Sequence, residues 1–538
     1  MADIRSTIKN CFAWIFSIGL IVNAPAMFFY TDATDSIRAY GSTQALMTSG
    51  RFVGHYLDVL FEWAGFYFPY RYINVLLYIL FVALAVIFIL LIFDVSARWK
   101  GCLIGAVVMT SAVNSGVLVY YFVAHMYGFC LLLSMFSTWL LLKKKMIVVP
   151  AILLALSLGI YQAYFASVIL IIFLYQMCRL LKEEVTVPAW LEEVVRCVCT
   201  VLAALLLYIA LNKFALNMAG LSIAGYVKMS ENVVPSYGLS DILQLIRSSY
   251  TLMFAFLFRH QYFFADNVLA RICIALSGVL FLYLYGLAFR KTTVSAKRVL
   301  LLLLLILLPL MINLPMFVEK AVPERICLNW YFIYILPLLL LDAVEGSALR
   351  EAANPVSVHR SMLLPLILIT MTTASLYSAY RNVTIYTGYQ KANEIAEETV
   401  HDIESRLAAC EGYRQTNELC FIGTLDVNKI NTHFFDIEYS EYLHKLFNRD
   451  HSSTFKRFAL RQYTYLTPDD ARVMKYTLSD MKEGKMKTGE EMLYCISGIH
   501  VGFPTIHSND PRIRSMPSYP NQGCVQVLDG ITFIKLSD

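Results

Sequence analysis

Long apolar stretches separated by short polar ones dominate the first 380 residues of this chain. A helix that spans the hydrocarbon core of a membrane needs about 20 mostly apolar residues, because every backbone polar group must be bonded within the segment. The pattern predicts eleven such helices. They cover residues 11–29, 72–94, 101–119, 126–142, 146–160, 162–178, 196–214, 268–289, 298–318, 327–343 and 361–380.

One further apolar stretch, residues 241–264, contains Arg247, Arg259 and His260. Charged groups inside hydrocarbon are costly, so we interpret this stretch as a helix that lies in the membrane interface, with a spanning helix as the alternative. The first apolar stretch also has an alternative, because residues 24–26 are typical of a signal-peptide cleavage region. We favour a retained helix, since cleavage would remove the first crossing.

Basic residues predict which ends of the helices face the cytosol, because short cytoplasmic loops are enriched in Lys and Arg. With the N-terminus inside, eleven crossings place the C-terminal part of the chain outside. The basic residues that this topology puts in cytoplasmic turns are Arg98, Lys100, Lys143, Lys144, Lys145, Arg179, Lys182, Arg290, Lys291, Lys297, Arg298, Arg350 and Arg360.

Charge density roughly doubles after residue 380. Residues 381–538 contain 18 Lys and Arg and 21 Asp and Glu, whereas the first 380 residues contain 26 and 18. We therefore divide the chain into a transmembrane domain, residues 1–380, and an extracytoplasmic domain, residues 381–538. The net charge of +5 is small for 538 residues, and no large basic cluster is present, so nucleic acid is not expected as a partner.

The second domain is predicted to be α+β. Apolar residues at helical spacing predict a helix over 386–408, and a strand is expected over 419–423. Alternating residues on both sides of Asp529-Gly530 predict a β-hairpin. Further helices are expected at 440–447 and 468–482. The fold class is thus a polytopic α-helical membrane protein with about eleven transmembrane helices and a C-terminal α+β domain.

Four of the 12 cysteines lie in the proposed outer domain. An even number of cysteines in an oxidising compartment permits two disulfides, with three possible connectivities. By proximity in sequence we favour Cys410–Cys420 and Cys495–Cys524. Four free thiols are the alternative.

Polar residues gather most densely in the first outer loop, residues 30–71. Asp32 and Asp35 are three apart, so one helical turn would put both carboxylates on the same face, with Arg38 three residues further along. A carboxylate can act as a general base towards an attacking hydroxyl. Arg38 and the nearby Arg51 can hold a phosphate through paired hydrogen bonds. The alternative is a capped helix start with surface ion pairs.

Other polar side chains lie at the predicted outer ends of helices. His125, Tyr127, Tyr161 and Gln162 are expected to line one extracytoplasmic substrate groove, although each alone is typical of interfacial anchoring. Arg325 is a third candidate for binding the donor phosphate, because an outside Arg at a helix start runs against the charge bias. No P-loop, dinucleotide fingerprint, HExxH or CxxC pair is present. We expect no cofactor and assign no metal, while a divalent ion on the two acids stays open.

Several short pieces of this sequence occur together in one known family. They are Asp35-Ser36-Ile37-Arg38, Gly50-Arg51-Phe52, Leu156-Ser157-Leu158-Gly159-Ile160-Tyr161-Gln162-Ala163, Pro323-Glu324-Arg325, Met516-Pro517-Ser518-Tyr519-Pro520 and the strand from Gly530 to Leu536. By their order and spacing the chain resembles the serotype-converting O-antigen glucosyltransferases of bacteria and phages, which are C-type (GT-C) membrane glycosyltransferases. The family usually has adjacent acids in the first loop. Here Thr34 precedes Asp35, and Asp32 is the other acid, so either carboxylate is a candidate base, with Asp35 placed first.

The resemblance implies an inverting transfer of a hexose, typically glucose, from a polyprenyl-phosphate donor. The acceptor would be a cell-surface polysaccharide such as lipopolysaccharide O-antigen, or its lipid-linked precursor. The reaction would take place at the outer face of the bacterial cytoplasmic membrane. In such enzymes the first outer loop supplies the catalytic acid, the helices form a groove for the prenyl tail, and the soluble domain shapes the acceptor side.

Two other functions fit the same topology. A transporter or flippase of lipid-linked saccharides would need polar residues near the bilayer centre on several helices, whereas here they gather on one side. An O-antigen polymerase or ligase would also use outer arginines, but commonly lacks both the acidic pair and a large outer domain.

Overall fold

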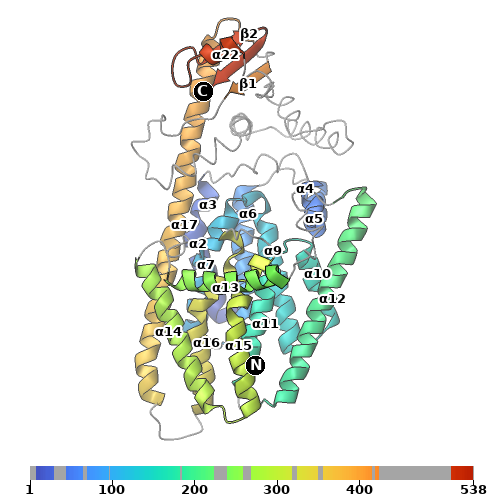
Figure 1. Ribbon diagram of the computed structural model, residues 1–538, viewed down its shortest axis with the longest axis vertical. Helices are drawn as coiled ribbons and strands as arrows, with labels where there is room; N and C mark the ends of the chain where they lie inside the picture. Colours follow the sequence, from blue (N-terminus) through green and yellow to red (C-terminus); the bar gives the residue numbers. More distant parts are fainter. Residues whose placement is uncertain are drawn as a thin grey trace.

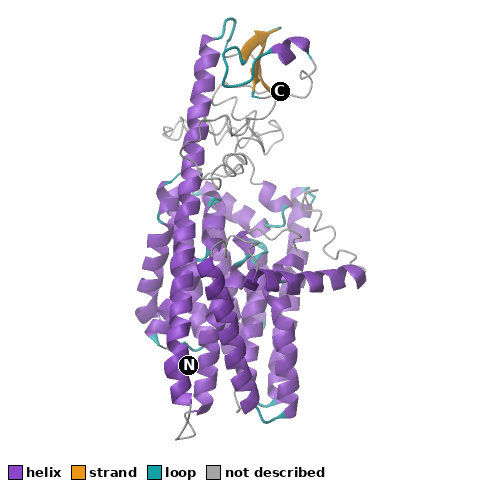
Figure 2. Ribbon diagram, turned by 60° about the vertical axis from the view of Figure 1, so that its left-hand side comes forward, coloured by secondary structure: helices purple, strands orange, loops and turns teal. Residues whose placement is uncertain are grey.

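The computed structural model shows a bundle of long helices with a small β-sheet beyond one end (Figures 1 and 2). Most helices run along the long axis of the molecule. The residues that the structure describes are 8–29, 44–64, 70–95, 97–181, 185–222, 239–258, 268–317, 324–348, 356–414, 418–422 and 510–536.

Six of the described helices are long and apolar enough to cross a membrane, as judged by length and composition. They are α6 (Arg71–Ile92), α9 (Tyr121–Lys143), α12 (Val187–Ala219), α14 (Val268–Lys291), α15 (Ser295–Ile312) and α17 (Val356–Ala409). A seventh candidate is the pair α7 (Arg98–Thr110) and α8 (Ala112–Leu118), which is bent by 44° at its junction. The protein is therefore a mostly helical, polytopic membrane protein.

Shorter apolar helices occupy the four other predicted crossings. They are α2 (Ala13–Asn23), flanked by a π-helical turn at Ile8–Phe12 and by α3 (Pro25–Phe28), then α10 (Val148–Leu158), α11 (Tyr164–Leu180) and α16 (Leu328–Ala348). With 11 residues, α10 rises only about 17 Å, which is less than the roughly 30 Å of a hydrocarbon core. Every predicted segment contains a helix, and the number of complete crossings stays a prediction.

Short elements lie between some of these helices. The described residues of the predicted first outer loop form two helices, α4 (Gln44–Thr48) and α5 (Phe52–Trp63). Two 3₁₀ turns, η6 (Leu314–Phe317) and η7 (Glu324–Ile326), lie between α15 and α16. These short elements matter because α5 and η7 position two of the candidate site residues.

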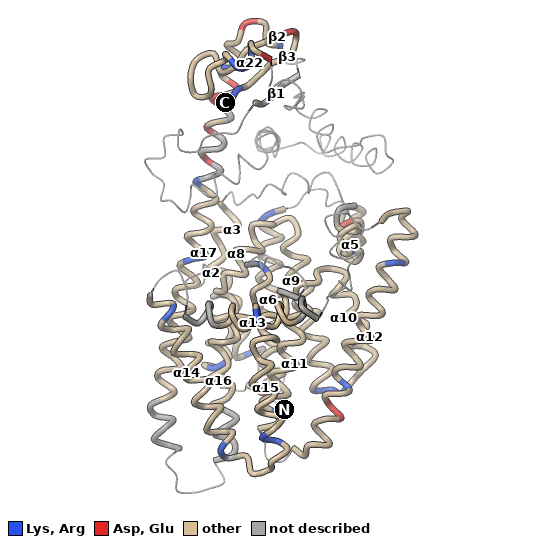
Figure 3. Tube along the Cα trace, viewed as in Figure 1, with Lys and Arg blue, Asp and Glu red and all other residues tan. Residues whose placement is uncertain are grey.

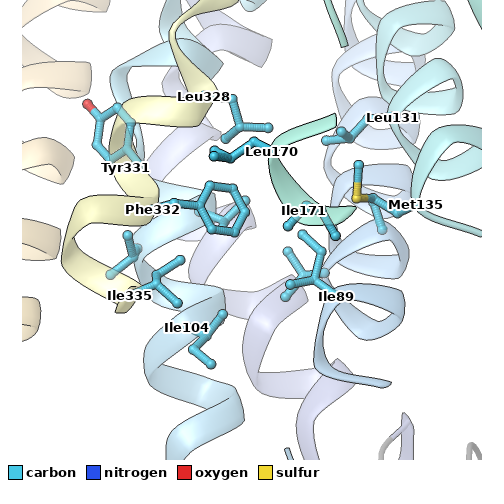
Figure 4. Packing of buried hydrophobic residues seen from close by; sticks show 14 of the residues in the cluster. Ile89, Ile104, Leu131, Met135, Leu170, Ile171, Leu328, Tyr331, Phe332 and Ile335 are labelled. Carbon is cyan, nitrogen blue, oxygen red and sulfur yellow. The ribbon is translucent and has the colours of Figure 1, made fainter. Parts of the chain in front are cut away.

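The core of the bundle is filled by leucine, isoleucine, valine and aromatic side chains. Phe332 and Ile335 of α16 lie beside Leu170 and Ile171 of α11 and Ile89 of α6 (Figure 4). All five are almost fully buried. The outward faces of α12, α14 and α15 instead carry exposed apolar side chains, as expected for helices that contact lipid, where exposure of such groups carries no penalty.

The bend between α7 and α8 leaves the last carbonyls of α7 without partners in a regular helix. Asn114 of α8 turns back and donates from Nδ2 to the carbonyls of Val108 at 2.9 Å and Met109 at 2.8 Å. Asn23, at the end of α2, donates to the Met109 carbonyl at 3.1 Å. Two buried amides from different helices thus satisfy this end of α7.

The long helix α17 completes the same junction. Asn382 donates from Nδ2 to the carbonyls of Thr110 at 2.8 Å and Ser111 at 3.2 Å. The hydroxyl of Tyr331, on α16, accepts a hydrogen bond from the backbone N–H of Ala112 at 2.9 Å. Because each of these donors and acceptors comes from a different helix, the break in α7–α8 is fixed by the tertiary structure.

Helix α13 (Leu239–Phe258) runs across the bundle, whereas its neighbours run along it (Figure 1). The amide of Asn313, just after α15, donates to the Ser249 carbonyl of α13 at 3.0 Å. A transverse position is the one that we expected for an interfacial helix over this part of the chain.

Helix α17 extends from the bundle to the C-terminal sheet without a break (Figure 2). Its 54 residues include both the last predicted crossing and the helix predicted over 386–408. The domain boundary that charge density indicated at residue 380 therefore falls inside one continuous helix, because a helix can leave the membrane and continue in water with only its surface composition changing.

The sheet has three strands in the order β1-β3-β2. β1 (Glu418–Ile422) is parallel to β3 (Ile531–Lys535), and β2 (Val525–Leu528) is antiparallel to it. Asp529 and Gly530 both have positive φ, at 52° and 82°, as a two-residue hairpin turn requires. The predicted strand and hairpin are confirmed. The short helix α22 (Pro511–Ser515) packs Ile513 against this sheet, and the helices predicted at 440–447 and 468–482 lie outside the described residues.

The favoured disulfides are not formed in the structure. Cys410, at the end of α17, carries a thiol 3.6 Å from the Val525 carbonyl of β2, whereas Cys420 is buried within the sheet on β1. Cys524 is also a thiol, 3.8 Å from the guanidinium of Arg406. Its proposed partner, Cys495, lies outside the described residues. Proximity in sequence was misleading because the end of α17 and the strand β1 direct the two nearer cysteines to different neighbours.

We expect Asn382→Leu to destabilise the protein, because the carbonyls of Thr110 and Ser111 would lose their donor in a buried place. The loss should be about 1–3 kcal/mol, visible as a lower unfolding temperature in detergent. Ser375→Ala is the matched control, because Ser375 is buried on the same helix and its hydroxyl has no hydrogen-bond partner in the described part of the chain. Equal stability of the Asn382 variant and the control would contradict this role.

Candidate functional site

Four segments meet in the half of the bundle nearer to the C-terminal sheet (Figure 1). They are the turn from α4 into α5, the start of α9, the turn between α10 and α11, and η7. Each carries an arginine or a tyrosine, so that guanidinium groups and aromatic rings are interleaved there.

Arg51 lies on the pair of tyrosines Tyr127 and Tyr161. Its Nη1 donates to the Tyr127 hydroxyl at 2.8 Å, and its Cζ lies 5.1 Å from the centroid of the Tyr161 ring. The two rings are stacked, 3.9 Å apart and inclined by 14°. Both tyrosines are about 95% buried, so a cation–π contact here is stronger than one in water.

Arg325 approaches the same tyrosines from η7. Its Nη1 donates to the Tyr120 hydroxyl at 3.4 Å, its Cζ lies 5.2 Å from the centroid of that ring, and the guanidinium interacts electrostatically with Tyr161. Gly116 of α8 makes this approach possible, since a Cβ there would lie 3.1 Å from the backbone nitrogen of Arg325. The bent pair α7–α8 thus sets the position of Arg325.

The charge of Arg325 is mostly buried, and no carboxylate among the described residues pairs with it. Burial opposes the charged form, yet the surrounding hydroxyls of Tyr161, Tyr120 and Tyr127 keep the pKa of Arg325 above its ordinary value. Burial also raises the pKa of Tyr161, so its hydroxyl stays neutral. A permanent cation surrounded by neutral polar groups and rings is suited to binding an anion.

Arg71 is a third arginine in this region, which the sequence analysis missed. It opens α6, its Cζ lies 4.3 Å from the centroid of the Tyr121 ring, and its Nη1 donates to the carbonyl of Phe29. The signal was present in the sequence: an arginine at the predicted outer start of a helix, against the charge bias, was the reason for selecting Arg325.

Six of the predicted site residues lie among the described residues, and their contacts differ. The structure brings Arg51, Tyr127, Tyr161 and Arg325 together, as described above. His125 packs edge-on against Phe61 of α5, with ring centroids 5.6 Å apart, and its buried Nδ1 has no hydrogen-bond partner among the described residues.

The side-chain amide of Gln162 is bonded to the turn before Arg51. Its amide nitrogen donates to the backbone carbonyls of Ser49 and Gly50, at 3.3 and 3.0 Å, and to the Tyr208 hydroxyl at 3.1 Å. Because a side-chain amide has only two N–H groups, these acceptors occupy them. The amide nitrogen of Gln162 therefore supports the turn before Arg51, and a role of this residue in the substrate groove stays a prediction.

The acids and the first arginine of the outer loop, Asp32, Asp35 and Arg38, lie outside the described residues, so their roles stay predictions. Among the described residues no three His, Cys, Asp or Glu side chains are grouped as a metal ion would require. The chemistry that the described part of the site supports is the binding of an anionic group by arginines held against tyrosines.

Comparison with known proteins gives one result. No curated protein and no solved structure matches the chain. The family model described as glucosyl transferase GtrII matches residues 25–341, a range that covers the helices from α3 to most of α16 and all the arginine and tyrosine contacts above. This match extends over more than half of the chain, so the protein belongs to the glucosyl transferase GtrII family, as its resemblance to the serotype-converting glucosyltransferases suggested.

Proposed function

We propose that this glucosyltransferase takes its sugar from a polyprenyl phosphate and transfers it, with inversion, to a cell-surface polysaccharide or its lipid-linked precursor. The observation that carries the proposal is the partly buried guanidinium of Arg325, which lies against tyrosine rings and hydroxyls. A buried cation of this kind is matched to an anionic ligand, and the lipid phosphate of the donor is the anion that this reaction releases.

The reaction is a single displacement at the anomeric carbon. The acceptor hydroxyl attacks, the bond from that carbon to the phosphate oxygen breaks, and the polyprenyl phosphate leaves with the electron pair. Asp35, or else Asp32, takes the proton of the acceptor hydroxyl as general base. Arg325 and Arg51 stabilise the negative charge that develops on the departing phosphate, an effect that is strong where water is excluded.

The distribution of charge supports an outward-facing site. Several Lys and Arg residues lie at the end of the bundle away from the sheet (Figure 3), and loops rich in Lys and Arg favour the cytosol. We infer that the arginine and tyrosine site faces the periplasm, in the cytoplasmic membrane of a bacterium. Helix α17 would then carry the C-terminal sheet outward on the acceptor side.

We expect the purified protein to transfer glucose from polyprenyl-phosphate-glucose to a matched polysaccharide acceptor, because its site provides cations for a lipid phosphate. The measurement is radiolabelled transfer in detergent or liposomes, with a nucleotide-linked glucose as the comparison donor. Transfer from the nucleotide sugar alone would overturn the donor assignment, and flux of a lipid-linked saccharide without transfer would indicate a transporter.

Arg325→Ala should raise KM for the lipid-linked donor roughly 10- to 100-fold, because a charged hydrogen bond to the phosphate is lost. Arg325→Lys should recover part of this loss, since it restores the charge but not the planar fork. Arg298→Ala is the control: Arg298 is an exposed arginine whose Nε donates to the Thr292 carbonyl, outside the site. An unchanged donor KM in Arg325→Ala would remove Arg325 from the phosphate site.

Asp35→Asn should abolish transfer while leaving expression and membrane insertion intact, because an amide cannot accept the proton of the acceptor hydroxyl. Asp32→Asn should reduce transfer less if Asp35 is the base, and the reverse order would exchange the two roles. The control is Asp94→Asn, which removes a carboxylate paired with Lys143 outside the site. Full transfer by both loop variants would refute a base in this loop.

A further inference from the structure

The turn that precedes Arg51 has a backbone conformation that only glycine adopts easily. Helix α4 ends there, with the Gly50 N–H bonded to the Met47 carbonyl at 3.0 Å and the Arg51 N–H to the Leu46 carbonyl at 2.9 Å. Gly50 has a φ of +74°. This is the left-handed cap that commonly ends a helix, and it fixes the direction in which the chain enters Arg51 and α5.

Two side chains from distant parts of the sequence hold this turn. The Gly50 carbonyl accepts hydrogen bonds from Gln162 Nε2 at 3.0 Å and from the Tyr208 hydroxyl at 3.1 Å. Gln162 lies between α10 and α11, and Tyr208 is on α12. The space is closed as well, since a Cβ on Gly50 would lie 2.7 Å from Tyr208 Oη.

The same interhelical turn is bonded to the chain after Arg51. The backbone N–H groups of Val53 and Gly54, in the first turn of α5, donate to the Gly159 carbonyl at 2.9 and 3.2 Å. Tyr161 belongs to the same turn, between Gly159 and Gln162, and Arg51 lies on its ring. Arg51 is therefore anchored on both sides to the segment that carries its aromatic partner.

We propose that Gln162 and Tyr208 are positioning residues for sugar transfer: they hold the Gly50 turn and thereby orient Arg51 towards the donor phosphate. This inference rests on the proposed function of Arg51. Neither side chain needs to contact substrate, because the Gln162 amide is engaged with the turn and with Tyr208. The Tyr208 hydroxyl acts through the same carbonyl.

Tyr208→Phe tests the proposal with the removal of one oxygen. We expect kcat/KM for the polyprenyl-phosphate donor to fall about tenfold or more, because a small displacement of a positioned group is costly in a reaction of this kind. The loss should appear mainly in the donor KM, with the acceptor KM unchanged. Gln162→Glu, which keeps the shape but replaces the donating amide, should behave in the same way.

Tyr285→Phe is the matched control. Tyr285 is a buried tyrosine on α14 whose hydroxyl donates to the Leu301 carbonyl at 2.6 Å. Removing this hydroxyl deletes the same kind of hydrogen bond as Tyr208→Phe does, but outside the site. We expect it to lower the unfolding temperature about as much as Tyr208→Phe does, with wild-type transfer kinetics. A similar fall in donor kcat/KM in both variants would mean that Tyr208 is merely structural.

A double-mutant cycle with Arg51→Ala separates this inference from the proposed function. If Tyr208 acts through Arg51, then Tyr208→Phe should have little further effect once the guanidinium is absent. Independent, multiplicative losses would overturn the positioning role. If the wild-type protein uses the lipid-linked donor and Tyr208→Phe has the same kcat/KM as the wild type, the inference about Tyr208 fails while the proposed function stands. If the wild-type protein does not use this donor, the proposed function fails first.

Discussion

The arrangement of the site depends on the satisfaction of main-chain carbonyls at the bend between α7 and α8. A helix that ends inside a bundle exposes polar backbone groups where no bulk water is available to bond them. Here the amides of Asn23, Asn114 and Asn382 supply the missing donors. The hydroxyl of Tyr386, on α17, in turn donates to Asn23 Oδ1 at 2.8 Å, so α2, α8 and α17 are tied to one junction.

The bend affects the site through the next helix, α8. It gives α8 a direction different from that of α7, which brings Gly116 against the backbone of Arg325 and leads the chain into Tyr120 at the start of α9. Arg325 and Tyr120 then meet. A straight helix through Ser111 would place Arg325 and Tyr120 elsewhere. The hydrogen bonds at the break therefore also determine the position of the cation in the site.

Sequence patterns predicted the helices well because each needs only a local apolar run, and they predicted the hairpin because Asp529-Gly530 suits its backbone. The break at Ser111 was missed, since single asparagines such as Asn114 and Asn382 look like isolated polar residues until distant helices meet. The contacts of Gln162 were not predicted for the same reason: its partners are the Gly50 turn and Tyr208, which are far away in the sequence.

The predicted base belongs to a segment whose two ends are held by the arginine and tyrosine site. Before it, the Phe29 carbonyl accepts a hydrogen bond from Arg71, which lies on Tyr121. After it, Gln162 and Tyr208 hold Gly50. Fixing both ends of a loop lowers the conformational entropy that its residues must still lose to reach a reactive geometry. Contacts that bind no substrate can therefore influence catalysis.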